Sequence, residues 1–140
     1  MAKSPTTGPG TEFELISKYE LLQLAGRLLK QEPAAIDLSV KFVLAETRGH
    51  WHGRARAMMC RRLKHCELAK SDSALLVGTI IDRLATGTFS EQFKDQLRLA
   101  LHLDFHRTVE ACRAIAGCTG RLYVARYAQW VLLPWREPKA

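Results

Sequence analysis

The 140-residue sequence lacks the long apolar segments that mark a membrane or secreted protein. No apolar run approaches the roughly 20 residues that a bilayer-spanning helix requires, and the first residues lack a secretory hydrophobic region. Only five residues are proline and 47% are hydrophobic, a composition that excludes a disordered chain. We therefore expect a folded protein of the cell interior, cytoplasmic or, in a eukaryote, nuclear.

The four cysteines lack the spacing of a metal site. Cys60 and Cys66 have five residues between them, as do Cys112 and Cys118. On one helix this spacing turns the two side chains about 120° apart, so neither pair closes on one metal. Buried, reduced thiols are the preferred interpretation, and a mixed site of Cys66, His65 and another helix stays open. We expect no metal and no cofactor.

The sequence also lacks the residue patterns of an enzyme. No glycine-rich phosphate loop follows a strand, and the carboxylates are scattered singly. His50 and His52 have no carboxylate close in sequence and no nucleophile motif. His102 and His106 are separated by Asp104, which we expect to cap a helix. We therefore expect no catalysis; a pocket that joins His50 or His52 to a distant carboxylate would favour an enzyme.

Apolar residues recur at spacings of three and four through most of the chain, and no segment alternates as a strand does. This periodicity predicts an all-α fold of about seven helices in stacked antiparallel hairpins. The stripes expected to face the core are Leu15/Tyr19/Leu22/Ala25/Leu29, Ile36/Val40/Val43/Leu44, Ala55/Met59/Leu63/Cys66, Leu76/Ile80/Leu84, Phe89/Phe93/Leu97/Ala100/Leu101 and Val109/Cys112/Ile115.

Capping and breaking residues predict where these helices begin and end. The first four helices are expected from Glu12 to Gln31, Pro33 to Gly49, Gly53 to Cys66, and Ser71 or Asp72 to Gly87. A Thr88–Glu91 capping box is expected to begin the fifth helix, and Asp104 is expected to cap the sixth. The last helix is expected over residues 121–133. Together they form one predicted domain, residues 12–135, with tails at 1–11 and 136–140.

The first tail, MAKSPTTGPG, has no apolar periodicity, so we expect it to be flexible. The stretch GTEFELIS, which begins at Gly10, is similar to a translated cloning site. Under that interpretation roughly the first 15 residues carry no biological information.

Glycines at 53, 87 and 120 are spaced by 34 and 33 residues, and each stands between two amphipathic segments. GRARAMMCRRL after the first echoes GRLYVARYAQWVL after the third. This spacing resembles HEAT or armadillo-like helical repeats over residues 33–133, and VARYAQWVLL resembles the second helix of a HEAT hairpin. The resemblance implies a solenoid that holds a partner. The family's regularly placed Pro, Asp and Arg are missing, which keeps a compact irregular bundle open.

Residues 48–66, RGHWHGRARAMMCRRLKHC, contain six Lys or Arg and no carboxylate. The rest of the chain holds 15 Lys or Arg against 14 Asp or Glu, so this segment carries almost all of the net charge of +7. On a helix Arg54 and Arg61 project away from the core stripe. Arg56 lies close to that stripe and has to snorkel or pair with a carboxylate, for which the candidates are Glu46, Asp82 and Asp95.

Two binding surfaces are predicted. A polyanion surface is expected on the basic segment, since Arg and an exposable tryptophan combine phosphate neutralisation with base stacking; its residues are Trp51, Arg54, Arg56, Arg61, Arg62 and Lys64. A protein interface, with a homodimer as one form, is expected where Tyr123, Tyr127 and Trp130 share one stripe. A partner helix or another acidic surface, such as an anionic membrane, would use the same charges as nucleic acid. An ordinary solvated helix and an ordinary packing helix are the further alternatives. Protein binding is the first hypothesis, nucleic-acid binding the second and an enzyme the third.

Overall fold

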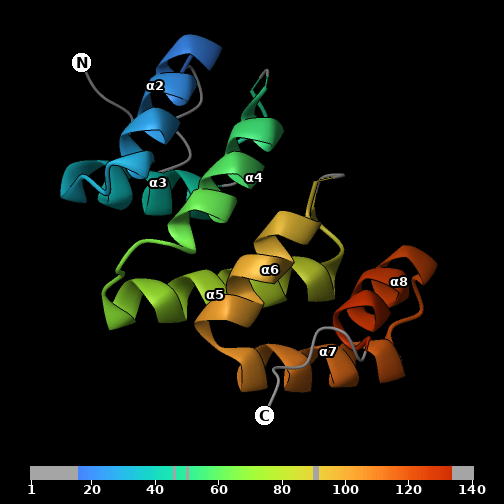
Figure 1. Ribbon diagram of the computed structural model, residues 1–140. Helices are drawn as coiled ribbons and strands as arrows, with labels where there is room; N and C mark the ends of the chain where they lie inside the picture. The colour runs from blue at the N-terminus through green and yellow to red at the C-terminus, as the bar shows by residue number, and fades with distance from the viewer. Residues whose placement is uncertain (1–15, 46, 50, 90–91, 134–140) are drawn as a thin grey trace, which may run out of the picture.

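The computed structural model describes residues 16–45, 47–49, 51–89 and 92–133, and within them the chain forms seven helices and no strand (Figure 1). The all-α prediction with about seven helices is confirmed. The helices are α2 (Lys18–Leu29), α3 (Pro33–Ala45), α4 (His52–Leu63), α5 (Lys70–Thr86), α6 (Lys94–Leu103), α7 (Phe105–Cys118) and α8 (Leu122–Val131).

The helices alternate between two layers. α4 packs between α2 and α6 in one layer, and α5 contacts both α3 and α7 in the other. α8 closes the stack against α7 and α5. In Figure 1, α4 and α6 run side by side in the same direction, from upper right to lower left. Side chains on the outer sides of these two helices therefore share one face of the protein.

The core lies between the layers, and most of the predicted stripes supply it. Leu76, Ile80 and Leu84 of α5 are fully buried, as are Met59 and Leu63 of α4. Each set recurs at three- and four-residue spacing, so its side chains leave the helix on one side. For these helices the sequence prediction of the buried face is confirmed.

The stripe predicted for the first helix is wrong. Tyr19 and Leu29 are 69% and 67% exposed, and only Ala25 of the described members is buried. The reason is that α2 carries a second apolar stripe with similar spacing, and that stripe faces the core. Its residues are Leu21, Leu24 and Leu28.

Several helix ends differ from their predicted places. Ser17 begins α2 with a capping box that the prediction missed: its hydroxyl accepts from the Glu20 amide at 3.1 Å, and its own amide donates to the Glu20 carboxylate at 2.9 Å. α5 begins after Ala69, before the predicted caps, and α6 begins only at Lys94, so Thr88 is not its cap. Glu91 lies outside the described residues. Asp104 caps α7 as predicted, accepting from the Arg107 amide at 3.1 Å.

Gly87 ends α5 in the left-handed conformation, with φ 74°. A Cβ there would collide with the Tyr123 hydroxyl and lie 2.6 Å from Nη1 of Arg121. We predict that Gly87→Ala lowers the free energy of unfolding by about 1–3 kcal/mol, because it adds left-handed strain and a clash. Gly26→Ala is the control, since a Cβ there meets nothing within 4 Å. Urea denaturation should show Gly26→Ala to be neutral or stabilising; equal effects would contradict the argument.

Candidate nucleic-acid interface

α4 turns its cations to solvent along one side. Arg54 and Arg61 are seven residues apart and both are exposed, as is His65 in the turn that follows the helix. Lys64 is half-buried. Residues 51–66 contain no Asp or Glu, so α4 offers these cations no partner from its own sequence. The predicted outward side of the basic helix is confirmed for Arg54 and Arg61.

Two arginines of the predicted polyanion set have structural roles instead. Arg56 is only 7% exposed: both of its Nη atoms donate to the Thr47 carbonyl, and its guanidinium lies 5.5 Å from the Phe42 ring centroid. Arg62 is half-buried and donates to the Ala25 carbonyl at 2.8 Å, which ties α4 to α2. The prediction of Arg56 as an exposed polyanion ligand is therefore wrong, because its position close to the apolar stripe turns its side chain inward.

α6 adds a second row of basic residues that the sequence analysis missed. Lys94, Arg98 and His102 follow one another at intervals of four, and all three are exposed. Such residues lie one above the next on a helix, about 6 Å apart along its axis. The signal was present in KDQLRLALH, where basic residues recur at every fourth position. What the sequence did not reveal is that this row lies beside α4.

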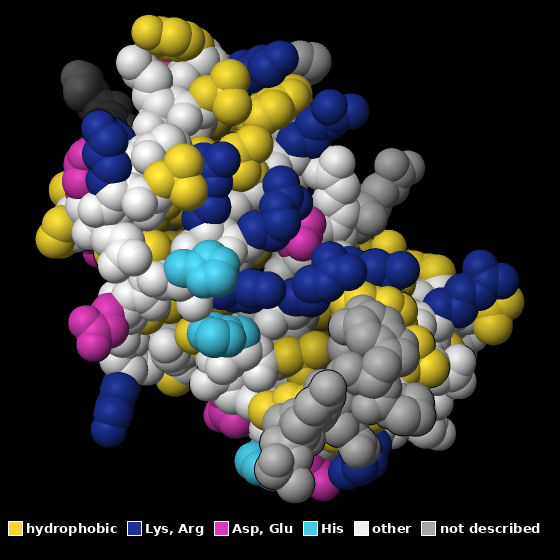
Figure 2. Space-filling view, viewed as in Figure 1, with side chains coloured by type: hydrophobic (Ala, Val, Ile, Leu, Met, Phe, Trp, Pro, Cys, Tyr) yellow, Lys and Arg dark blue, Asp and Glu magenta, His cyan; other side chains and the backbone are white. Residues whose placement is uncertain are grey.

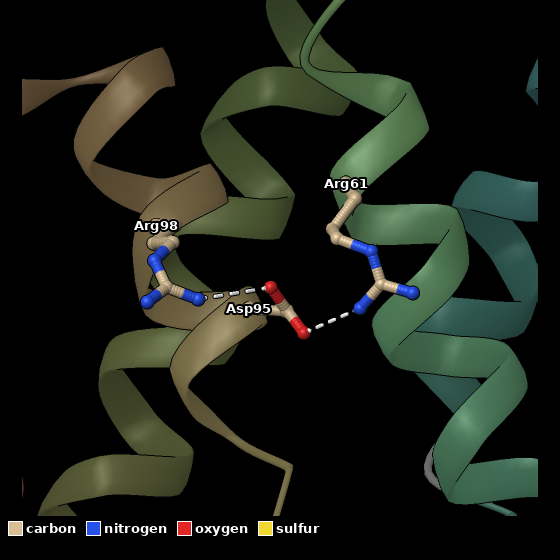
Figure 3. A network of polar contacts seen from close by, with 3 residues as sticks. All are labelled: Arg61, Asp95 and Arg98. Atoms are coloured by element: carbon tan, nitrogen blue, oxygen red, sulfur yellow. Dashed lines mark hydrogen bonds and ion pairs between the residues drawn. The ribbon is translucent and has the colours of Figure 1, made fainter.

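Asp95 joins the two rows (Figure 3). Its Oδ2 lies 2.8 Å from Nη1 of Arg61, and its Oδ1 lies 3.2 Å from Nη1 of Arg98. The Asp95 side chain is 14% exposed, whereas both arginines remain about half exposed. One carboxylate therefore holds two guanidinium groups from different helices in fixed positions. It neutralises only one of the two charges.

The residues of the two rows form a surface that we term the basic face: Arg54, Arg61, Lys64, His65, Lys94, Arg98 and His102. Figure 2 shows Lys and Arg side chains gathered in a band over α4 and α6, with histidine side chains at its lower left end. The other layer differs, because its charges are nearly balanced, with one Lys or Arg and one carboxylate on α3, two of each on α5, and two Arg against one carboxylate on α7. The excess charge of the described helices is concentrated on one side.

The aromatic stripe of α8 borders this face. Trp130 is half-buried, and Nζ of Lys94 and Cζ of Arg98 each lie 5.1 Å from its ring centroid. Tyr127 packs edge-on against Phe89, with ring centroids 4.8 Å apart. Both residues, which the sequence assigns to a protein interface, are half-buried against side chains of the same chain.

Tyr123, the third residue of that stripe, is more open. Its hydroxyl donates to the Gly87 carbonyl at 3.0 Å, and 45% of the residue is exposed. Trp51, predicted as a polyanion ligand, is half-buried before α4 with φ 68°, and Nζ of Lys18 lies 5.2 Å from its ring centroid. It belongs to the junction of α2 with α4.

His52 serves the packing of α4 against the preceding loop. It is fully buried, with Nδ1 2.6 Å from the Thr47 hydroxyl and Nε2 3.0 Å from the Ile16 carbonyl. A neutral ring satisfies both contacts by donating from Nε2 and accepting at Nδ1. His50 lies outside the described residues. No group of three or more His, Cys, Asp or Glu suited to a metal ion occurs in the described part of the chain.

The four cysteines are free thiols in different environments. Burial raises the pKa of Cys60 and of Cys112 to about 12, and it also raises the pKa of the half-buried Cys66. Cys118 is exposed, which corrects the expectation that the cysteines are buried. It is the last residue of α7, and the preceding Gly117 is exposed as well.

These environments predict the order of thiol modification. In the native protein at pH 8 we expect Cys118 to react first with a disulfide reagent, because the thiolate is the attacking species and only this sulfur is exposed. Cys60 and Cys112 should react only after unfolding in urea. Mass spectrometry of the modified peptides measures the order. Modification of Cys60 in the folded protein would contradict it.

Comparison with protein-family models, curated proteins and solved structures gives no match for this chain. None of the helices in the described ranges combines the length and apolarity that a bilayer crossing needs.

Proposed function

We propose that this protein is a non-enzymatic binding module whose basic face binds nucleic acid. The observation that supports this most directly is the alignment of two rows of cations, one from α4 and one from α6, with Asp95 as the one carboxylate on these two helices. Like charges held together repel one another, and a polyanion relieves that repulsion while it releases its own counterions.

The dimensions of the face suit a phosphate chain. Neighbouring helices lie about 8–10 Å apart, and the cations are about 6 Å apart along α6 (Lys94 and Arg98) and about 10 Å apart along α4 (Arg54 and Arg61). The two rows therefore offer several contacts to phosphates that follow one another along a strand. Arg61 and Arg98 are held in place by Asp95, so less side-chain entropy is lost when they bind.

The sequence resemblance to HEAT-like repeats favours the same general role, because stacked hairpins are chiefly used to hold partners. An acidic protein is the competing partner for a basic face. Nucleic acid is favoured because the charges are arginine-rich, lie in extended rows and border a tryptophan, a combination typical of phosphate and base recognition.

Fluorescence anisotropy with labelled RNA and DNA at 50 and 200 mM salt tests this function. We expect micromolar or tighter binding at 50 mM salt and a log–log salt slope of about −3.5 for a single strand or about −4.5 for a duplex, the values for five neutralised phosphates. The five cations are Arg54, Arg61, Lys64, Lys94 and Arg98.

Polyglutamate of similar length serves as the competing probe. Nucleic acid should bind more tightly than polyglutamate, because only nucleic acid offers phosphates and bases. Absence of binding at 50 mM salt, or equal binding of polyglutamate, would overturn the proposal. The exposed stripe of Tyr19, Leu22 and Leu29 on α2 would then become the surface to test for protein binding.

A further inference from the structure

Trp130 of α8 stands at the edge of the basic face, next to α6. Two cations of that face, Lys94 and Arg98, lie over its ring at 5.1 Å each. The indole is half-buried, so part of it reaches solvent beside exposed cations. An aromatic ring that is partly exposed beside cations can stack on a base, and it can also pack against its neighbours within the protein.

The α8 helix that carries Trp130 is held firmly. Tyr127, three residues earlier, contacts Phe89 and Phe93, and those two rings are stacked with centroids 4.3 Å apart. Ala128 and Val131, on either side of Trp130, are buried in the core. The position of the indole relative to α6 is thus set by the core, which a recognition site requires.

Arg98 connects the indole to the centre of the basic face. Its guanidinium approaches the Trp130 ring and donates to Asp95 at 3.2 Å, while Asp95 pairs with Arg61 at 2.8 Å. A continuous line of contacts therefore runs from α8 across α6 to α4. A nucleotide laid along this line would meet a π surface at one end and phosphate-binding arginines at the other.

From this arrangement we propose that Trp130 and Arg98 form a stacking subsite for an unpaired base, and that the ligand of the basic face is single-stranded nucleic acid. The inference rests on the proposed function and names the class of nucleic acid. A duplex presents phosphates to the two rows but keeps its bases stacked inside, so it cannot use the indole.

The first test uses the unmodified protein. We compare a 12-nucleotide DNA strand, its duplex, and a strand of the same length in which the bases are replaced by abasic sites. The abasic strand keeps the phosphates and loses every stacking partner. We expect it to bind about 10- to 100-fold more weakly than the normal strand, which should also bind more tightly than the duplex. Equal affinities for the normal and abasic strands would overturn the inference.

The second test uses variants at Trp130. Trp130→Leu is expected to weaken single-strand binding about 10-fold or more and to leave duplex binding within about twofold, whereas Trp130→Phe should keep most of the affinity. Tyr19→Leu is the matched control, because Tyr19 is an exposed aromatic residue of α2 and lies off the basic face. Circular dichroism verifies that each variant is folded.

The outcomes separate the two proposals. Failure of the unmodified protein to bind any nucleic acid at low salt would overturn the proposed function. Salt-dependent binding that is equal for strand, duplex and abasic strand would leave the function standing and overturn the stacking subsite. Equal weakening of strand and duplex by Trp130→Leu would also overturn it, because the indole would then act through packing alone.

Discussion

Arg61→Glu combined with Arg98→Glu is expected to abolish nucleic-acid binding, with an affinity loss on the order of 100-fold or more at 50 mM salt. Each change removes a cation from the centre of the basic face and adds a carboxylate beside Asp95. In the unmodified protein Asp95 pairs with both arginines. Three carboxylates would then occupy the place where phosphates are proposed to bind. The salt slope should shrink by about 1.4 or more, since two phosphate contacts disappear. Anisotropy titrations at several salt concentrations measure both effects.

The matched control places the same charge change on the other layer. Lys41 of α3 and Arg113 of α7 are exposed, and each pairs with a carboxylate of its own helix, Asp37 at 3.1 Å and Glu110 at 3.6 Å. Lys41→Glu with Arg113→Glu should weaken binding by less than about threefold at 0.1 M salt, where the Debye length is about 10 Å. Equal losses in the two double variants would show that net charge, and not the basic face, governs binding.

A neutral pair of substitutions separates loss of contacts from local repulsion. Arg61→Gln with Arg98→Gln removes both cations without adding carboxylates beside Asp95. We expect an intermediate loss of affinity and an unfolding free energy within about 1 kcal/mol of the unmodified protein, because half-exposed ion pairs contribute little to stability. If the Gln pair binds as well as the unmodified protein, these arginines do not contact the ligand.

The outward side of α4 was predictable because local spacing determines it. Ala55, Met59 and Leu63 recur at intervals of four, and a helix must place Arg54 and Arg61 on the opposite side. The same reasoning failed for α2, where two apolar stripes satisfy the helical period equally well. The contact of α2 with α4 decides between them, and that contact depends on the rest of the fold.

The α6 row of the basic face shows a different limit of prediction from sequence. Lys94, Arg98 and His102 are visible in the sequence as a four-residue repeat, so the row itself was predictable. Its position beside α4 depends on how nonadjacent helices pack, and residues 61 and 95 are 34 positions apart in the chain. A contact of this kind leaves no local pattern. For the same reason the sequence predicts a protein interface at Trp130 and does not reveal that Trp130 lies next to Arg98.

Phe93→Ala is expected to have the largest effect on stability, lowering the free energy of unfolding by about 3–5 kcal/mol. Phe93 is fully buried at the start of α6, stacked on Phe89 and edge-on to Tyr127 at 6.0 Å. Truncation removes a large apolar surface from the core and leaves a cavity where α5, α6 and α8 meet. For a domain whose total stability is about 5–15 kcal/mol, this is a substantial fraction. Urea denaturation followed by circular dichroism measures the change.

Leu29→Ala provides the control for Phe93→Ala, since it also removes an apolar side chain but from a residue that is 67% exposed. Its effect on the free energy of unfolding should stay within about 0.5 kcal/mol.

Phe93 also supports Tyr127. In Phe93→Ala, α8 and the Trp130 indole should therefore lose their packing at lower urea concentrations than the other helices unfold. Near-ultraviolet circular dichroism should therefore report a loss of aromatic signal at urea concentrations where the helical signal persists. Coincident loss of both signals would mean that α8 and the remaining helices unfold as one unit, and that the aromatic junction is not a separate source of stability.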